Sequence, residues 1–172
     1  MNVPKITKII ENKREAKNII TSTFRYPGEI IPGQFFMVWI PDVDEIPMSV
    51  SYINGDIKAI TFRKVGDATS ALSKLKPGDK IGIRGPYGNG FKIHGKHILF
   101  VGGGTGVAML APAVEEAVKN GISSTVVIGA KNKSELFFEK RLKKCGARVV
   151  ISTDDGSVGC KGFASDIAIS II

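Results

Sequence analysis

The sequence predicts a six-stranded antiparallel β-barrel followed by an incomplete parallel α/β sheet. Within residues 1–95, six short segments rich in β-branched and aromatic residues are separated by turn residues, a pattern typical of a small closed barrel. Within residues 96–172, strand-like and helix-like segments alternate, which indicates a parallel sheet. The 172 residues are enough for one or two small domains, and we expect the boundary near residue 95.

The expected elements of the first domain are strands and one short helix. We expect strands at 3–10, 16–24, 34–40, 48–53, 57–65 and 79–84. The sequence Asn54-Gly55-Asp56 is a strong hairpin signal between the fourth and fifth strands. Residues 67–75 predict a short helix, which Lys76-Pro77-Gly78-Asp79 ends.

The second domain is expected to alternate strands and helices. We expect strands at 97–101, 125–129 and 148–152, helices at 107–119 and 134–144, and a further helix beginning near Phe163. Asn132 and Glu135 have the spacing of a capping box for the helix at 134–144. The first strand should be central in a doubly wound sheet, yet one of its neighbours is missing. We therefore expect that the chain is incomplete or that another subunit covers this strand edge.

Composition excludes several classes of function. The net charge is +8, but the lysines are scattered without a basic stripe, so nucleic-acid binding is not favoured. No signal-peptide core or membrane-spanning run is present, which predicts a cytoplasmic protein without membrane association. Cys145 and Cys160 lack metal-ligand spacing, and we expect neither a metal site nor a nucleophilic catalytic residue.

Two glycine-containing segments are candidate ligand sites. Gly102–Gly106 contains four glycines in five positions between a strand and a helix, which suits a phosphate cradle at a helix N-terminus. The spacing departs from G-x-G-x-x-G because Val107 occupies the third glycine position, so a tight strand–helix turn remains the alternative. Gly85–Phe91 either links the domains or lines a cleft where two ligands meet.

Three further segments each allow a functional and a structural interpretation. Ile46–Ser51 is either a flavin cradle or a plain strand with an early proline. Phe62–Ser70 offers hydroxyls and two cations for a diphosphate, or else a helix capped by Asp67 beside a solvated basic pair. Thr153–Ser157 follows the third parallel strand, where its carboxylates would bind ribose hydroxyls or form a solvated acidic turn.

In combination and in order, these segments resemble one protein family. The resemblance is carried by Pro47-Met48-Ser49, Val65–Thr69, Gly85–Phe91, the glycine loop, Glu135–Phe138, Thr153–Ser157 and Lys161-Gly162-Phe163. The chain resembles the electron-transfer subunit of NAD-dependent dihydroorotate dehydrogenase, within the ferredoxin–NADP reductase superfamily, over essentially all its residues. The resemblance implies an FAD-binding barrel, a nicotinamide-nucleotide domain, a [2Fe–2S] cluster and a catalytic FMN subunit as partner in pyrimidine biosynthesis.

The resemblance also assigns residues by position. It places FAD at Ile46, Pro47, Met48, Ser49, Phe62, Arg63, Lys64, Gly66, Thr69, Ser70 and Asn89, and NAD at Gly103, Gly104, Thr105, Gly106, Thr153, Asp154 and Asp155. Two departures stand out. The family usually has an arginine where this chain has Ile46, so Arg63 or Lys64 would have to substitute. The cysteine cluster that holds the [2Fe–2S] group in the family is absent from this sequence.

The predicted function is electron transfer between FAD and a nicotinamide nucleotide on behalf of a dihydroorotate dehydrogenase catalytic subunit. The cofactors would supply the chemistry, so no side-chain acid or base is expected. Two alternatives remain: the small flavoprotein subunit of another NAD(P)H-dependent ferredoxin-type oxidoreductase, and a truncated, non-catalytic flavin-binding paralogue. The choice between NAD and NADP also stays open, because Lys131 and Lys133 would suit a 2′-phosphate.

Overall fold

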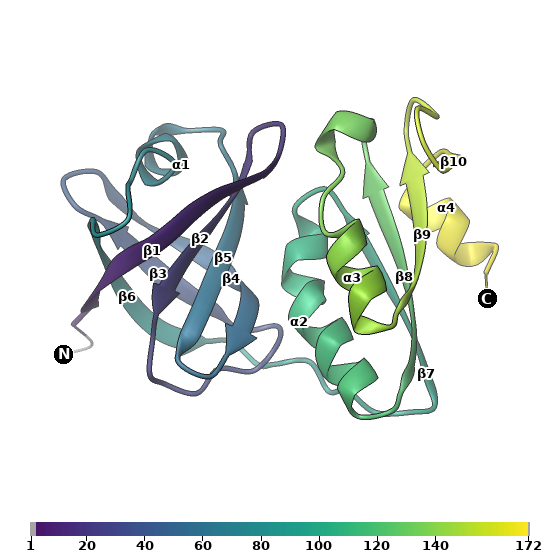
Figure 1. Cartoon of the computed structure of the whole chain (residues 1–172), viewed down its shortest axis with the longest axis horizontal. Helices are drawn as coiled ribbons and strands as arrows, with labels where there is room; N and C mark the ends of the chain where they lie inside the picture. Colours follow the sequence, from purple (N-terminus) through teal and green to yellow (C-terminus); the bar gives the residue numbers. More distant parts are fainter. Residues whose placement is uncertain (1–2, 172) are drawn as a thin grey trace. The chain divides into compact units, whose positions relative to one another are not determined.

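The computed structural model describes residues 3–171, which divide into two compact units (Figure 1). The first unit extends to Phe91, and the second begins at Lys92. The first contains β1–β6 and α1, whereas the second contains β7–β10, α2–α4 and a short 3₁₀ helix, η1.

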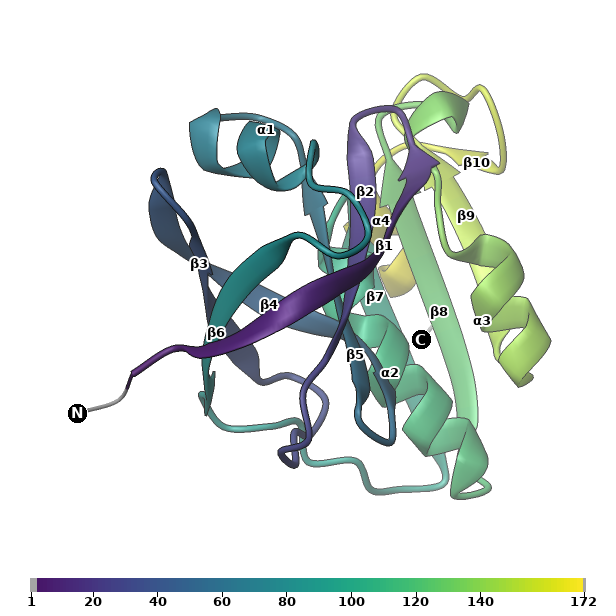
Figure 2. The same ribbon diagram turned by 60° about the vertical axis from the view of Figure 1, so that its left-hand side comes forward.

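The first unit is a closed six-stranded barrel, as the sequence predicts. Its strands are β1 (Lys5–Ala16), β2 (Ile19–Arg25), β3 (Phe35–Ile40), β4 (Asp44–Asn54), β5 (Ile57–Arg63) and β6 (Lys80–Tyr87). They close in the order β1-β2-β5-β4-β3-β6, with antiparallel pairing throughout. Figure 2 shows the strands curving around a common interior, with α1 at one end. Phe24, Phe36 and Ile60 lie fully buried in that interior.

Several strand boundaries predicted from the sequence are wrong, and the largest differences lie in two segments. The first strand does not end at residue 10 but extends to Ala16, and the second begins at Ile19. The polar stretch 11–16 pairs with β2, and Asn18 adopts a left-handed conformation (φ 59°) that closes the hairpin. β4 begins four residues before the predicted strand, because Asp44–Pro47 pair with β3. In both cases ladder hydrogen bonds outweigh the polar composition of the segment.

The helix α1 (Asp67–Leu72) ends three residues before the predicted end at Leu75. Asn12 on β1 explains this end, since its Nδ2 donates to the carbonyl oxygens of Leu72 at 2.9 Å and Leu75 at 2.8 Å. A side chain distant in the sequence thus satisfies carbonyls that another helical turn would have used. This contact also fixes α1 against the barrel.

The second unit is a parallel sheet with helices, again as predicted. Its elements are β7 (His97–Gly103), α2 (Gly106–Lys119), β8 (Ser123–Ala130), η1 (Lys133–Glu135), α3 (Glu139–Cys145), β9 (Arg148–Thr153), β10 (Cys160–Lys161) and α4 (Ala164–Ile169). The strand order is β10-β9-β8-β7, with parallel pairing throughout. The two-residue strand β10 is too short for the sequence to predict. Within residues 3–171, β7 pairs only with β8 and lies at the sheet edge.

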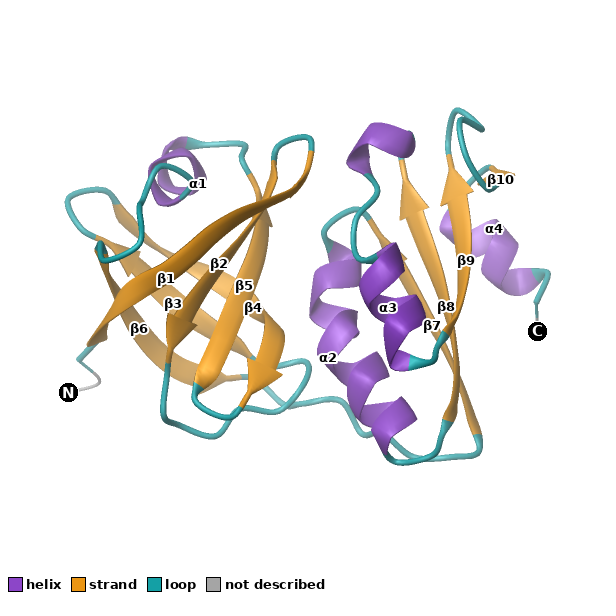
Figure 3. Cartoon of the chain, in the orientation of Figure 1, coloured by secondary structure: helices purple, strands orange, loops and turns teal. Residues whose placement is uncertain are grey.

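Helices cover both faces of this sheet (Figure 3). A Cβ added to Gly102 would meet Val107 and Leu110 of α2, which places α2 on the face toward which Gly102 points. A Cβ added to Gly129 would lie 2.8 Å from the Cβ of Ala164, so α4 covers the other face. Because successive strand residues point to opposite faces, Gly103 points toward the α4 side.

The predicted helix at 134–144 is wrong, because the segment is broken. Asn132 caps η1 instead, its Oδ1 accepting from the Ser134 amide at 3.0 Å. The backbone then becomes extended and turns through Phe138, which has a left-handed conformation (φ 64°), before α3 begins. Phe137 and Phe138 are both buried, with ring centroids 4.8 Å apart. The extended backbone at Leu136 and the left-handed Phe138 are incompatible with a continuous α-helix, so α3 begins only at Glu139.

Candidate functional site

The segment Ile46–Ser49 lies within β4 of the barrel. Ile46 and Met48 are partly buried and pack against the barrel core, as expected from their pairing with Val38 and Phe36. By strand alternation, Pro47 and Ser49 therefore point to the opposite face, where Pro47 is exposed and Ser49 is half-buried. Only one face of this segment, together with its backbone, is available to a ligand.

The end of β5 separates the two candidate cations. Phe62 is buried in the core, so Arg63 points to the opposite face, where Thr61 also lies. Lys64 follows the strand, and its amide donates to the carbonyl oxygen of Asn18 at 2.8 Å. Its side chain helps to line a cavity of about 310 Å³, together with Asn12, Arg14, Asn18, Ile20 and Ser73. Arg63 and Lys64 thus belong to different surroundings although they are neighbours in sequence.

The turn before α1 is ordered by the Thr69 hydroxyl. Thr69 Oγ1 accepts from the amides of Val65 and Gly66 at 3.0 and 3.1 Å, and it donates to the Gly66 carbonyl at 3.1 Å. The Ser70 amide also donates to the Gly66 carbonyl, at 2.8 Å. A Cβ added to Gly66 would meet no atom within 4 Å, so the space beside this glycine is open. The geometry favours a capped turn with one open side, where a ligand can approach the backbone.

The loop 85–91 is held by contacts within the barrel unit. The Tyr26 hydroxyl donates to the Gly85 carbonyl at 2.5 Å, and burial raises the pKa of Tyr26 above its ordinary value of 10.0. Gln34 Nε2 donates to the Gly88 carbonyl at 3.0 Å. The Phe91 amide donates to the Pro32 carbonyl at 2.8 Å, while Asn89 lies exposed at the tip. These contacts give the loop a defined shape.

The glycine loop of the second unit divides into structural and open positions. A Cβ on Gly102 would lie 3.0 Å from the backbone of Val107, so this glycine permits the close approach of α2 to β7. Gly104 has a left-handed conformation (φ 53°), and its amide donates to the Gly129 carbonyl at 2.8 Å. Gly103 and Gly106 have no atom within 4 Å of an added Cβ. This open space at the start of a 14-residue helix suits the approach of a phosphate.

The turn after β9 presents carboxylates at the carboxyl edge of the sheet. Thr153 is buried, and its hydroxyl donates to the Val158 carbonyl at 2.8 Å, so it is a structural part of the turn. Asp154 and Asp155 are exposed. Asp155 accepts from the Ser157 hydroxyl and its amide, the latter at 2.9 Å, and these hydrogen bonds lower the pKa of its carboxyl. Asp154 is the carboxylate that lies outside this local network and faces solvent.

A second loop lies against this turn and brings two lysines to the same edge. The Lys133 amide donates to Ser157 Oγ at 2.8 Å, and the Asp155 amide donates to the Lys131 carbonyl at 3.3 Å. The side chains of Lys131 and Lys133 are exposed. This edge of the sheet therefore presents both carboxylates, which disfavour the 2′-phosphate of NADP, and ammonium groups, which favour it. The sequence alone does not decide between NAD and NADP.

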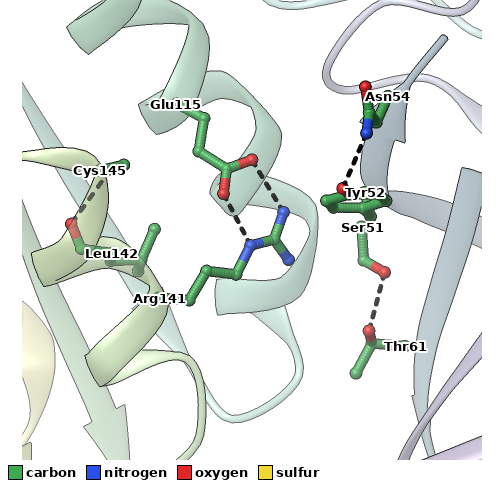
Figure 4. Close-up of polar contacts among 8 residues, drawn as sticks. All are labelled: Ser51, Tyr52, Asn54, Thr61, Glu115, Arg141, Leu142 and Cys145. Carbon is green, nitrogen blue, oxygen red and sulfur yellow. Dashed lines mark hydrogen bonds and ion pairs between the residues drawn. The ribbon is translucent and has the colours of Figure 1, made fainter.

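A chain of hydrogen-bonded hydroxyl groups links three neighbouring strands of the barrel, and sequence reasoning did not predict it. Thr21, Thr61 and Ser51 lie on β2, β5 and β4, and each is at most 8% exposed. Thr21 Oγ1 and Thr61 Oγ1 are 2.8 Å apart. Thr61 also donates to Ser51 Oγ at 2.7 Å, the contact that Figure 4 shows. The sequence shows only that hydroxyl residues occur in three separate strand segments. No local pattern indicates that these residues contact one another.

An ion pair in the second unit fixes α3 to α2. The guanidinium of Arg141 donates to both carboxylate oxygens of Glu115, at 2.7 and 2.8 Å, as Figure 4 shows. The same guanidinium lies over the Phe138 ring, 4.7 Å from its centroid. The two contacts hold the segment that follows η1 in place, below the loop that carries Lys131 and Lys133.

Comparison with solved structures identifies the fold as that of the ferredoxin reductases. An NADH-dependent reduced ferredoxin-NADP oxidoreductase matches 99% of this chain, with a TM-score of 0.88 and 28% identity, and 64% of its own chain is covered. The flavohem-like FAD/NAD binding domain of nitric oxide dioxygenase from Vibrio cholerae matches 93% of this chain, with a TM-score of 0.84 and 16% identity over 79% of that chain. No protein-family model matches the sequence.

Curated relatives confirm the resemblance to a particular electron-transfer subunit. The chain is 51% identical over 140 residues to the probable dihydroorotate dehydrogenase B (NAD(+)), electron transfer subunit, of Methanocella arvoryzae, covering 81% of this chain and 52% of the relative. A relative of the same name from Methanothermobacter thermautotrophicus is 43% identical, covering 96% of this chain and 64% of the relative. The chain is thus a homologue of these subunits and spans between half and two thirds of their length.

Residues 3–171 contain no group of three or more His, Cys, Asp or Glu side chains arranged to hold a metal ion. Cys145 and Cys160 are free thiols, and burial raises the pKa of Cys145. None of the helices in this range has the length and apolar character needed to cross a membrane.

Proposed function

We propose that this chain is the FAD- and nicotinamide-binding part of an electron-transfer subunit that serves a dihydroorotate dehydrogenase catalytic subunit in pyrimidine biosynthesis. The observation that carries the proposal is the 51% identity to a probable subunit of that name, found together with the ferredoxin reductase fold. The proposal includes an FAD domain at residues 1–95, a nicotinamide domain at 96–172 and a cytoplasmic location. Bound FAD would supply hydride exchange with a nicotinamide and release of single electrons toward the partner.

The barrel residues fit FAD in their chemistry and in the space they leave. The open space beside Gly66 admits a phosphate to the backbone before α1. Ser49 presents a hydroxyl on the face of β4 that points away from the core, and Arg63 points to the corresponding face of β5. The role of this surface is to bind and orient the flavin. Ile46, Pro47, Met48, Phe62, Thr69, Ser70 and Asn89 complete the proposed cradle by shape, backbone or turn geometry.

The glycine loop fits the pyrophosphate of a dinucleotide. Gly103 and Gly106 leave open space, and the amino end of α2 provides a positive dipole end for an anion. Gly104 and Thr105 shape the turn between them, with Gly104 fixed by its hydrogen bond to the Gly129 carbonyl. The role of this loop is to hold the dinucleotide by its charge and not by its bases.

The carboxylates after β9 favour NAD over NADP. Asp154 is exposed at the carboxyl edge of the sheet, where a carboxylate can accept hydrogen bonds from ribose hydroxyls. Asp155, held ionised by its bonds from Ser157, would repel a 2′-phosphate. Lys131 and Lys133 oppose this preference, but their charges are on flexible, exposed side chains. The curated relatives carry NAD(+) in their names, which supports the same choice.

Reconstitution and titration test the proposal. The purified chain is mixed with FAD, and binding is followed by quenching of flavin fluorescence; reduction of the bound flavin by NADH and NADPH is followed at the flavin absorbance band. We expect stoichiometric FAD binding and faster reduction by NADH. Arg63→Gln should weaken FAD binding by about tenfold or more, because it removes a charge-assisted hydrogen bond to the phosphate. Lys64→Gln is the matched control and should leave it unchanged. Absence of FAD binding by the unaltered chain would refute the proposal.

A second candidate function is the small flavoprotein subunit of another NAD(P)H-dependent ferredoxin-type oxidoreductase. It is favoured by the structural match to an NADH-dependent reduced ferredoxin-NADP oxidoreductase, at 28% identity over 99% of this chain. The two candidates share the cofactor sites and differ in the partner. Co-purification of the full-length protein with a dihydroorotate-oxidising subunit, against co-purification with a ferredoxin-reducing one, distinguishes them.

A further inference from the structure

The hydroxyl chain Thr21–Thr61–Ser51 has a defined direction. A threonine hydroxyl has one proton to donate, and Thr61 donates its proton to Ser51 Oγ. The contact between Thr21 and Thr61 therefore has Thr21 as donor and Thr61 as acceptor. The chain runs from β2 through β5 to β4, where Ser51 Oγ accepts from Thr61. Thr21 donates, Thr61 both accepts and donates, and Ser51 accepts, so the chain fixes three rotamers together.

The chain ends at an irregularity in the strand that carries the proposed flavin cradle. Val50 pairs with Ile60, but Tyr52 pairs with Ala59, so Ser51 is an extra residue between two regular pairs. Such bulges bend a strand and change the direction of nearby side chains. Ser51 is fully buried and lies two residues after Ser49, on a strand whose register decides which side chains face the core.

The positions of Thr61 and Ser49 connect the chain to the cradle. Ile60 and Phe62 point into the core, so Thr61 points to the opposite face of β5. The pairing of β4 with β5 ends at Val50 and Ile60, so Ser49 and Thr61 are the next residues of the two strands beyond that pair. Valine would fill the space of either threonine and suits a strand at least as well, so packing alone does not require hydroxyls here. What hydroxyls add is a directional link at the bulge.

We infer that the Thr21–Thr61–Ser51 chain is a positioning network that fixes the β4 bulge and thereby sets the orientation of Ser49 toward the flavin. The inference rests on the proposed function, since it concerns the same cradle. Thr61 is the central member, because it accepts from one neighbour and donates to the other. Its removal breaks both links, whereas serine in its place keeps both.

Three variants of the complete protein test the inference. Thr61→Val removes the central hydroxyl, Thr61→Ser restores it, and Thr23→Val makes the same change on β2 outside the chain. FAD affinity is measured by fluorescence titration, and the midpoint potential of the bound flavin by dye equilibration. We expect Thr61→Val to weaken FAD binding by about tenfold, as for one lost hydrogen bond, and to shift the potential. Thr61→Ser and Thr23→Val should behave as the unaltered protein.

A flavin-free readout separates a positioning role from loss of the fold. Backbone amide resonances of the apo protein should move at residues 49–52 in Thr61→Val and stay in place in Thr61→Ser. Unchanged resonances there, or an unaltered affinity and potential in Thr61→Val, would overturn the inference while leaving the proposed function intact. Failure of the unaltered protein to bind FAD overturns the proposed function itself, and the flavin role of the chain falls with it.

Discussion

Alanine substitutions in the glycine loop should separate its structural position from its ligand position. At Gly102, a Cβ would lie 3.0 Å from both the amide nitrogen and the Cα of Val107, and 2.9 Å from Leu110 Cδ1. The leucine terminus can rotate away, but the backbone of α2 cannot move without separating the helix from β7. Overpacking of this kind costs about 1–3 kcal/mol in free energy of unfolding. For a unit of this size, Gly102→Ala should lower the Tm by roughly 4–8 °C per kcal/mol lost.

Gly106→Ala is the matched variant with the opposite expectation. Gly106 begins α2 at a negative φ, and an added Cβ would meet no atom within 4 Å. Alanine should therefore raise the free energy of unfolding, by up to about 0.5–1 kcal/mol, because it loses less conformational freedom on folding than glycine. If a pyrophosphate occupies the open space, the same methyl group excludes it. NADH binding should then weaken by about tenfold or more.

Thermal unfolding and NADH titration of the two variants give four independent values. Calorimetry measures the Tm, and quenching of NADH fluorescence measures the dissociation constant on the folded protein. The reasoning is refuted in its structural part if Gly102→Ala is as stable as the unaltered protein. It is refuted in its functional part if Gly106→Ala binds NADH normally.

Three further substitutions have simple expected outcomes. Tyr26→Phe should lower the free energy of unfolding by about 1 kcal/mol below pH 10.0, the ordinary pKa of tyrosine. Because folding raises the Tyr26 pKa, this contribution is lost as the pH rises through the pKa of the folded protein. The urea midpoints of the two proteins should therefore converge at high pH. Asn12→Ala should lower the free energy of unfolding by about 1–3 kcal/mol, as urea denaturation can measure, since the Leu75 carbonyl loses the Asn12 amide and the Leu72 carbonyl keeps only the Leu75 amide at 3.3 Å. Asp154→Asn should reduce the ratio of NADH to NADPH affinity, measured by paired titrations.

The barrel and the parallel sheet were predictable because each depends on a repeated local pattern. Strand alternation and turn residues predict six strands, and the apolar run followed by glycines predicts β7 and α2. The boundaries depend on partners distant in sequence. The polar stretch 11–16 becomes a strand because β2 offers it a ladder, and α1 ends because Asn12 takes its last carbonyls. Neither the pairing with β2 nor the contact of Asn12 can be predicted from neighbouring residues alone.

The break at Phe138 shows the same limit for the candidate site. Local propensity favours a helix through 134–144, but the backbone is extended at Leu136 and left-handed at Phe138, where both phenyl rings are buried and Arg141 lies over the Phe138 ring. The consequence reaches the ligand loops, since η1 follows directly after Lys131 and Asn132 and holds Lys133 against Ser157. The sequence identifies which residues surround the carboxyl edge, but their arrangement depends on this tertiary packing.

Position 46 shows how the structure changes the meaning of a sequence departure. The family pattern expects an arginine there, and the sequence offers Arg63 or Lys64 as a substitute. Ile46 packs against the barrel core, so its side chain points away from the face on which Ser49 lies. Lys64 lines a cavity with Arg14 and Asn18, whereas Arg63 shares its face of β5 with Thr61. Since Thr61 is linked to Ser51 on the strand of the proposed cradle, we propose Arg63, and not Lys64, as the cation that takes the phosphate role.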